Sequence, residues 1–135
     1  MNTEKTLLMI KPDATRNNFT GAIVKFVEDK GLKLIKIESK KMTKHEAEEF
    51  YQEHKDRSFF KDLIDYICSG MVVAVCLEAE DAVKKLREIN GDTNPKNAKD
   101  GTIRKIYGRS IDENAVHGSD SLDSAKREIN FFFKK

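Results

Sequence analysis

The residues best suited to chemistry lie in one segment near the C-terminus, Asn-Ala-Val-His-Gly-Ser-Asp-Ser at positions 114–121. His117 follows two apolar residues and precedes a glycine, so we expect it at the end of a short strand, facing open space. A neutral imidazole is a competent nucleophile near pH 7, because the ordinary pKa of histidine is about 6.5. Gly118 has no side chain, which would let a bulky substrate group approach the ring.

A nucleophilic histidine needs a partner that orients its other ring nitrogen. Glu128, in the helix expected to follow, is the candidate for this role, and Ser119 could bridge the two side chains. A lone histidine is more often structural than catalytic. The residues around His117 therefore decide whether it is structural or catalytic.

Basic side chains elsewhere in the chain could hold an anionic group. Arg104 lies in a glycine-punctuated loop beside Thr102, and a guanidinium matches phosphate oxygens in geometry. Lys11 precedes Pro12, where the first strand must stop, and this favours a directed role, whereas Arg87 on its own resembles a surface charge. The sequence has no GxxxxGK[ST] loop, no GxGxxG after a strand and no protein-kinase catalytic loop, so side chains would have to hold any phosphate.

Composition indicates a globular protein. The chain has 135 residues, of which 39% are hydrophobic and 36% charged, too apolar for a disordered chain. Its net charge of +2 suits an anionic small molecule at least as well as nucleic acid. No apolar run approaches the about 20 residues of a membrane span, and no signal peptide is evident. Cys68 and Cys76 lack CxxC spacing and are expected to be buried thiols, so the expected location is cytoplasmic.

Short apolar runs alternate with stretches of helical periodicity. The expected strands span residues 6–10, 32–37, 71–77 and 115–116. The expected helices begin near residues 20, 43, 60, 81 and 122. Thr43 and Glu46 match a capping box, and the run at 71–77 is apolar enough for a central strand covered on both faces. Residues 90–115 are rich in turn formers, and a loop of this length is usually functional or mobile. The alternation predicts a mixed α/β sandwich.

Four separated segments resemble motifs of the nucleoside diphosphate kinase family. Residues 114–121 resemble its active-site signature, N-x-x-H-G-x-D-x. Residues 6–13 resemble the opening strand with its Lys-Pro-Asp, residues 50–60 the nucleotide-clamping helical hairpin, and residues 91–104 the substrate loop. The helix at 121–132 resembles the one that follows the nucleophile. These motifs occur in the family's order, so the similarity is not due to chance.

The resemblance implies one domain over residues 1–135 with an α/β (α+β) sandwich fold. Its core would be ferredoxin-like, βαββαβ, with an antiparallel four-stranded sheet, an extra helical hairpin and a long substrate loop. The implied activity transfers the terminal phosphate of a nucleoside triphosphate to a nucleoside diphosphate. It would follow a ping-pong mechanism through a phosphohistidine, with broad base specificity. Mg²⁺ would arrive on the nucleotide phosphates, and the chain would form a homo-oligomer, with a hexamer slightly favoured over a tetramer. No membrane or specific nucleic acid is expected as a partner.

The resemblance also assigns roles to single residues. His117 would accept the phosphate, and Glu128 and Ser119 would orient its ring. The residues that would hold the phosphates are Lys11, Arg87, Thr93 and Arg104. The remaining contacts would come from Asn114 on the sugar and its 3′-hydroxyl, Phe59 stacked on the base, Tyr51 beside the nucleophile, and Asp120 in the metal's water shell. No chemistry is assigned to His45 or His54.

Two departures from the family pattern and two other functions bear on this interpretation. Ser58 and Met71 stand where the family often has proline, and the chain ends without the longer tail of many eukaryotic relatives. A noncatalytic nucleotide-sensing or scaffold module would need a blocked or absent nucleophile, yet His117 and its neighbours are intact. A nucleic-acid-binding domain would need aromatic and basic residues interleaved on an exposed sheet, whereas these strands are apolar.

Overall fold

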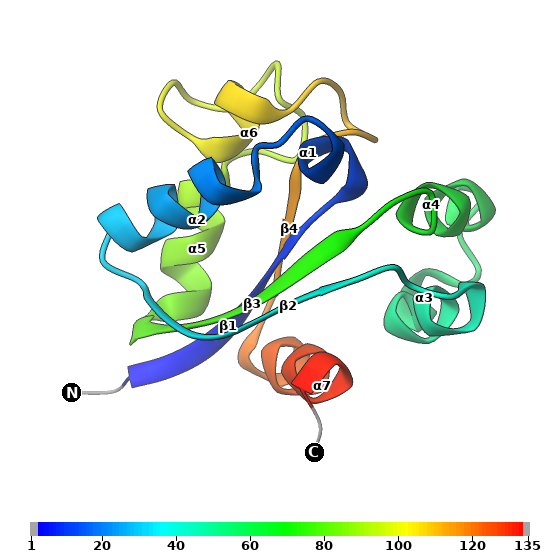
Figure 1. The fold of residues 1–135 in the computed structure, drawn as a ribbon, viewed down its shortest axis with the longest axis horizontal. Helices are drawn as coiled ribbons and strands as arrows, with labels where there is room; N and C mark the ends of the chain where they lie inside the picture. Colours follow the sequence, from blue (N-terminus) through cyan, green and yellow to red (C-terminus); the bar gives the residue numbers. More distant parts are fainter. Residues whose placement is uncertain (1–2, 134–135) are drawn as a thin grey trace.

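A four-stranded antiparallel sheet in the order β2-β3-β1-β4 forms the centre of the fold, as the computed structural model in Figure 1 shows. The structure describes residues 3–133. The strands are β1 (Thr3–Ile10), β2 (Lys33–Lys40), β3 (Val72–Glu80) and β4 (Val116–Gly118). This strand order, with helices in the connections, is the expected ferredoxin-like βαββαβ arrangement.

Burial follows the position of each strand in the sheet. The apolar run of β3 is buried from Val72 to Leu77, as expected of a strand with neighbours on both sides. β2 lies at the edge and is mostly exposed, and its pairing with β3 is irregular between Leu34 and Lys36. That irregularity changes which side chains face inward, so Ile37 is about half exposed instead of facing the core.

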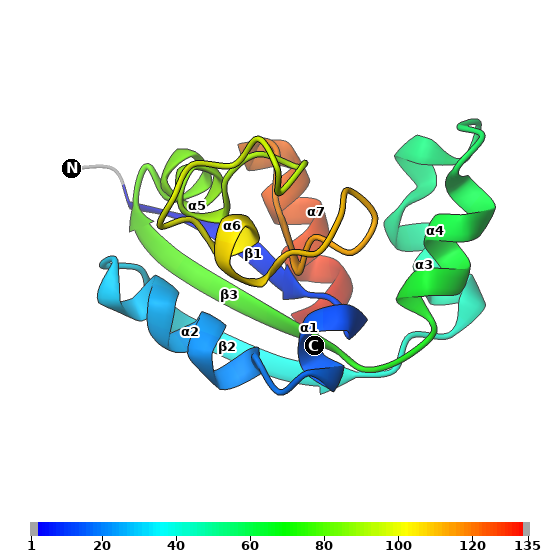
Figure 2. The same cartoon turned by 90° about the horizontal axis from the view of Figure 1, so that it is seen from above.

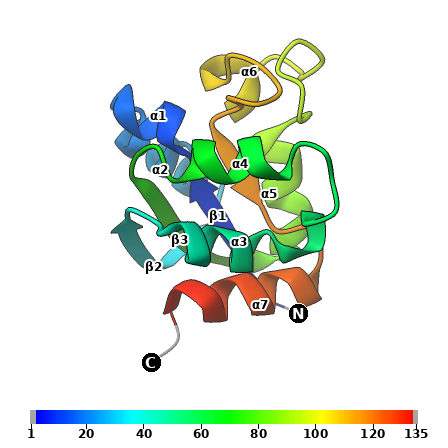
Figure 3. The same cartoon turned by 90° about the vertical axis from the view of Figure 1, so that its right-hand side faces the viewer.

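Helices cover both faces of the sheet. They are α1 (Pro12–Arg16), α2 (Thr20–Asp29), α3 (Lys44–Phe50), α4 (Phe60–Ile67), α5 (Ala82–Asn90), α6 (Ile103–Tyr107) and α7 (Leu122–Phe133), with a 3₁₀ turn at Gln52–His54. Figures 1 and 2 show α2 and α5 on one face, α7 on the other, and α3 and α4 at one end of the sheet. Figure 3 shows α3 and α4 side by side as a hairpin above α7. Within residues 3–133, no helix combines the length and the hydrophobicity needed to cross a membrane.

The two faces of β1 enter two separate hydrophobic clusters. Leu8 and Ile10 pack with side chains of α2 and α5, whereas Leu7 and Met9 pack with α3, α4 and α7. This alternation is the period of a strand buried on both faces. β1 therefore contacts the helices on both faces of the sheet and also pairs with β4, which carries His117.

Two short helices were not expected from the sequence. Pro12 stops β1, as predicted, but it also begins α1, because the first helical position needs no N–H donor. Inside the expected loop at 90–115, Thr102 accepts a hydrogen bond from the Lys105 N–H and starts α6. Each helix has five residues, too few for a periodic signal. The Thr43 capping box is confirmed, and the helix that it begins, α3, ends at Phe50.

Candidate active site

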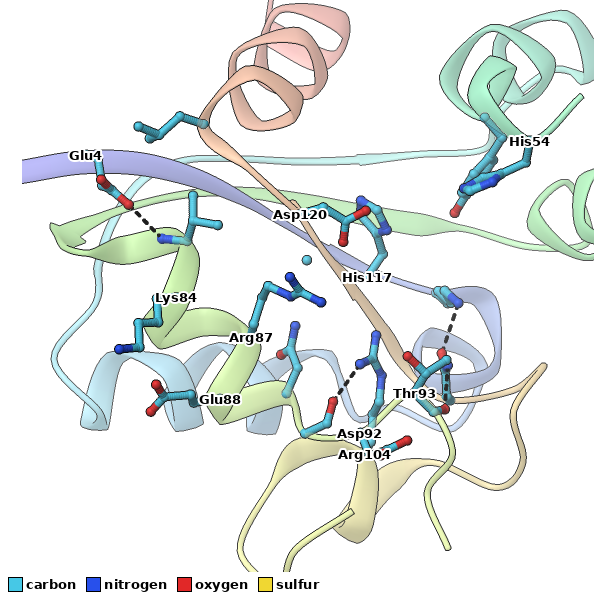
Figure 4. A pocket seen from close by; sticks show the side chains of 18 residues that line it. Glu4, His54, Lys84, Arg87, Glu88, Asp92, Thr93, Arg104, His117 and Asp120 are labelled. Atoms are coloured by element: carbon cyan, nitrogen blue, oxygen red, sulfur yellow. Dashed lines mark hydrogen bonds between the residues drawn. The ribbon is translucent and has the colours of Figure 1, made fainter. Parts of the chain in front are cut away.

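A wide pocket of about 930 Å³ opens in front of β4 (Figure 4). Most of the residues expected at the site line it, although they come from segments far apart in the chain. They are Lys11, Tyr51, Arg87, Thr93, Arg104, Asn114, His117 and Asp120. Ser119 and Glu128 lie behind His117, buried in the fold, and Phe59 does not line the pocket. The fold therefore brings together in one cavity groups of the kinds suited to nucleophilic attack and to anion binding.

His117 is held from behind by a buried carboxylate. It is the middle residue of β4, opposite Met9 of β1, and not at the strand end as expected. Its Nε2 lies 3.0 Å from Oε1 of Glu128, which reaches it from α7. The Ser119 hydroxyl donates to the same oxygen at 2.7 Å and accepts a hydrogen bond from the Leu7 N–H at 3.3 Å. Ser119 thus fixes Glu128 to β1, and the contact between His117 and Glu128 needs no bridge.

The charge on Glu128 is stabilised where it lies. Burial alone would raise the pKa of this carboxyl. The hydrogen bond and charge of His117, the Ser119 hydroxyl and the charge of Arg127 outweigh burial, so the pKa lies below its ordinary value. Arg127 also donates to the Phe50 carbonyl at 3.2 Å and pairs with Glu53 at 2.6 Å. An ionised Glu128 can only accept hydrogen bonds, which assigns the shared proton to Nε2 of His117.

Lys11 and Asn114 form a second buried pair beside the nucleophile. The Lys11 ammonium donates to Oδ1 of Asn114 at 2.9 Å, and the Asn114 amide donates to the Thr93 carbonyl at 3.0 Å. Burial is the main cause that lowers the pKa of Lys11 to about 8, and the neighbouring positive charge of Arg104 adds to it. Among residues 3–133, the Lys11 ammonium is hydrogen-bonded to the neutral amide of Asn114 and to no carboxylate.

Arg104 donates hydrogen bonds to the backbone and also lines the pocket. Its two terminal nitrogens donate to the carbonyls of Gly91 and Val116, each at 2.8 Å, so it ties the segment at 90–108 to β4. Burial lowers its pKa, and so does the charge of Arg87. Figure 4 shows Arg87 and Asp120 close to His117, whereas Glu88 lies farther along α5. Together with Lys11, these two arginines give the pocket three cationic side chains besides Lys84, which lies near Glu88.

Gly118 packs closely against α5, in addition to lining the pocket as expected. A Cβ there would lie 2.8 Å from the Asn90 side chain and 3.4 Å from Leu86, both in α5. Any larger residue at position 118 would therefore have to displace the Asn90 side chain. Asn90 itself is buried, lines the pocket and has an oxygen without a hydrogen-bond partner. Its importance was not visible in the sequence, because an asparagine at a helix end is a common capping residue.

The aromatic residues divide between core and surface. Phe60 packs against the cluster of α3, α4 and α7, whereas Phe59 is 47% exposed, so only one of these adjacent rings lies against the core. The centroid of the Tyr51 ring lies 6.3 Å from that of His117, with the ring planes nearly perpendicular. His54 lies between, its centroid 6.4 Å from Tyr51 and 5.9 Å from Phe59. Sequence reasoning gave His54 no role, yet it lines the pocket.

The pocket offers acidic side chains but no preformed metal cage. Asp92 and Asp120 line it, and both are exposed. Among residues 3–133, no three His, Cys, Asp or Glu side chains are grouped so that they could hold a metal ion. Mg²⁺ binds oxygen ligands and keeps several of its waters, so it suits a site with one nearby carboxylate and phosphates that bring the rest.

Comparison with known proteins agrees with this geometry. A sequence model of the nucleoside diphosphate kinase family matches residues 4–135. The nucleoside diphosphate kinase of Persephonella marina is 50% identical over 135 residues, 100% of this chain and 96% of that protein. The enzyme so named in Bartonella tribocorum is 53% identical over the same shares.

Solved structures agree in the fold. The Aquifex aeolicus nucleoside diphosphate kinase has a TM-score of 0.95 and 39% identity, over 98% of this chain and 96% of that one. The Halobacterium salinarum enzyme, solved in complex with CDP, has a TM-score of 0.95 and 38% identity, over 99% and 90%. The family match spans nearly the whole sequence and its relatives are of matching length, so this chain belongs to the nucleoside diphosphate kinase family.

Proposed function

We propose that His117 is the phosphate carrier of this chain and that its Nδ1 is the attacking atom. As a nucleoside diphosphate kinase, the chain transfers the terminal phosphate of a nucleoside triphosphate to a nucleoside diphosphate in two half-reactions. The observation that carries the assignment is the 3.0 Å contact between Nε2 and Glu128. It places the ring proton on Nε2 and leaves the lone pair of Nδ1 free for attack.

In the first half-reaction, the Nδ1 lone pair forms a bond to the terminal phosphorus. The bond from that phosphorus to the bridging oxygen breaks, and the diphosphate leaves with the electron pair. In the second half-reaction, a terminal oxygen of another diphosphate attacks the phosphohistidine and takes the phosphate. The ring becomes more cationic when Nδ1 is phosphorylated, and the ionised Glu128 stabilises that charge.

Lys11, Arg87, Thr93 and Arg104 would hold the phosphates. Phosphoryl transfer depends on positioning and on charge stabilisation more than on proton transfer. The support for these roles is that all four side chains line the pocket with His117, and that Lys11 and Arg104 are already fixed by hydrogen bonds. A fixed donor does not have to reorganise when charge develops, so its stabilisation is not reduced by that cost.

Asn114 would contact the sugar and its 3′-hydroxyl, and Phe59 would stack on the base. Asn114 is oriented for this by Lys11 and by the Thr93 carbonyl. Phe59 is exposed in the turn of the helical hairpin, directly before α4, and its ring lies near His54, which lines the pocket. Stacking accepts any base, since each base has a π-face, and this agrees with broad base specificity. Tyr51 would flank the nucleophile.

Mg²⁺ would arrive on the nucleotide, with Asp120 contributing through water. When bound, the ion would neutralise part of the phosphate charge. The chain's contribution is Asp120, which lies beside His117, and the three cationic side chains that face the same phosphates.

We also propose that the chain works as a homo-oligomer, with a hexamer slightly favoured over a tetramer. Support comes from exposed apolar side chains in the segment at 90–115, where Ile106 and Ile111 are 51% and 55% exposed. Exposed isoleucines in one loop segment indicate a surface that another subunit could cover. A cytoplasmic location and a single domain over residues 1–135 stay predictions from the sequence.

Phosphorylation of His117 is tested with terminally labelled ATP. We expect protein-bound label that survives base and is lost in acid, because a phosphoramidate is acid-labile. His117→Ala should carry no label, while His45→Ala, at an exposed position on α3, should be labelled like the unchanged protein. Label on a serine, or label retained in His117→Ala, would contradict the mechanism.

Nucleotide affinity should depend on the protonation of Lys11. Its pKa of about 8 leaves the side chain neutral in alkaline solution, so the phosphates lose one cationic partner. We expect ADP affinity, measured by calorimetry, to fall between about pH 8 and about pH 9.5, by at most about tenfold per pH unit. Lys11→Arg should flatten this dependence, because arginine keeps its charge.

The same shift has a consequence for stability. Between a pKa of about 8 in the folded protein and 10.5 in the unfolded chain, the unfolded chain binds one more proton. This group therefore makes the free energy of unfolding rise with pH across that range.

An ADP affinity that stays constant in the unchanged protein up to about pH 9.5, well above the pKa of Lys11, would refute the role assigned to Lys11.

Phe59→Ala should weaken nucleotide binding and do little to the chemistry. Loss of stacking on one base costs about 1–3 kcal/mol, so Kd should rise for all four triphosphates. Phe59→Tyr keeps an aromatic face and serves as the control. The measurement is Kd together with the single-turnover rate at saturating nucleotide. Unchanged affinity for every base would remove Phe59 from the site.

Pro95→Ser should weaken assembly before it affects His117. Pro95 is buried, and a Cβ on Gly108 would lie 2.8 Å from its ring, so it packs the two arms of the 90–115 segment together. Serine frees the backbone that proline restricts. Sedimentation at micromolar concentration should show dissociation in Pro95→Ser but not in Lys96→Ser, an exposed neighbour. A fully active monomer of the unchanged chain would show that assembly is not needed.

A further inference from the structure

The backbone just before β4 is strained. Ala115 has a φ of 76°, in a region that residues with a Cβ rarely adopt. The Val116 N–H donates to the Asn114 carbonyl at 2.9 Å, so Ala115 is the central residue of a three-residue turn. A γ-turn with positive φ is rare and strained. The turn directly joins Asn114 to the strand that carries His117.

Two hydrogen bonds from one segment hold this turn. The Ala115 N–H donates to Oδ2 of Asp13 at 3.1 Å, and the Lys11 N–H donates to the Ala115 carbonyl at 2.8 Å. Asp13 is 2% exposed, and it does not line the pocket. Burial of a carboxylate is unfavourable unless hydrogen bonds compensate, so the position of Asp13 calls for a reason.

The other oxygen of Asp13 is bound by the helical hairpin. The Tyr66 hydroxyl, from α4, donates to Oδ1 of Asp13 and accepts a hydrogen bond from the Asp13 N–H at 3.0 Å. Asp13 lies in the first turn of α1, yet its oxygens go to Ala115 and Tyr66, and α1 has no side-chain cap at its N-terminus. Helix capping therefore does not explain the carboxylate.

We propose that Asp13 is a positioning residue for phosphoryl transfer, which holds the strained turn at Ala115 and so sets the places of Asn114 and His117. Tyr66 links this support to the hairpin that bears Phe59 and Tyr51. The inference rests on the proposed function of His117. It adds that a carboxylate outside the pocket determines whether His117 and the Asn114 amide are correctly placed for the nucleotide.

The test measures the single-turnover rate of His117 phosphorylation by ATP, with ADP affinity and thermal stability alongside. The variants are Asp13→Ala, Asp13→Asn, Tyr66→Phe, and Asp13→Ala combined with Ala115→Gly. Thr15→Val is the matched control, because the Thr15 hydroxyl also anchors α1, to the Met71 carbonyl at 2.7 Å, without touching Ala115.

Asp13→Ala should slow phosphorylation by about 10- to 100-fold, as expected for a reacting group displaced by about 1 Å. Asp13→Asn should recover most of the rate, because its amide oxygen can still accept from the Ala115 N–H. Ala115→Gly should restore part of the rate to Asp13→Ala, since glycine adopts positive φ freely. Thr15→Val should lose thermal stability and keep the rate.

The outcomes separate this inference from the function it rests on. If the unchanged protein and Thr15→Val are not phosphorylated, the proposed function fails and the inference fails with it. If they are phosphorylated and folded Asp13→Ala reacts at the same rate, only the positioning role is overturned. The role is equally overturned if Asp13→Ala is slow but neither Asp13→Asn nor the added Ala115→Gly restores the rate. Should Asp13→Ala not fold, Tyr66→Phe carries the test, because the Tyr66 hydroxyl holds Asp13 in place; a slower rate there supports the positioning role, and an unchanged rate overturns it.

Discussion

The buried contact between His117 and Glu128 is the constraint on which the rest of the site depends. A carboxylate in this place is tolerated only because His117, Ser119 and Arg127 together lower its pKa against the effect of burial. Glu128 belongs to α7 and His117 to β4, so the ring can be oriented only if α7 packs on the sheet beside β4. The packing of α7 on the sheet therefore also sets the tautomer of His117, because it brings Glu128 to Nε2.

The site has no glycine-rich phosphate loop, and the antiparallel topology explains how it manages without one. β1 lies between β3 and β4, so the end of β1 places Lys11 beside the strand that carries His117. Arg104 then fastens the long segment after α5 to the same strand through two backbone carbonyls. Under the proposed function, Lys11, Arg87 and Arg104, from three distant parts of the chain, would take the place of the backbone amides that other phosphate sites use.

The sequence predicted the sheet and most helices, and most of the residues it singled out for the site do line the pocket. Apolar runs mark strands such as β3, Thr43 and Glu46 mark a helix start, and the segment around His117 has a long ordered signature. What it could not predict depends on contacts between distant residues. The Asp13 carboxylate meets Ala115 across 102 positions, and a Cβ at position 118 would meet the side chain of Asn90. No local pattern encodes either contact, and five-residue helices carry no period.

The electrostatics of the pocket favour an anion before any substrate is specified. Lys11 and Arg104 each have a lowered pKa, because burial removes water from them and neighbouring positive charges repel them. Both side chains nevertheless stay fixed by hydrogen bonds to neutral oxygens. Nearby carboxylates offset these effects only in part, so a phosphate in the pocket would relieve an unfavourable interaction as well as form new contacts. Under the proposed function the same cations would face the phosphorus that His117 attacks, so the free energy that selects a polyphosphate would also stabilise the transfer.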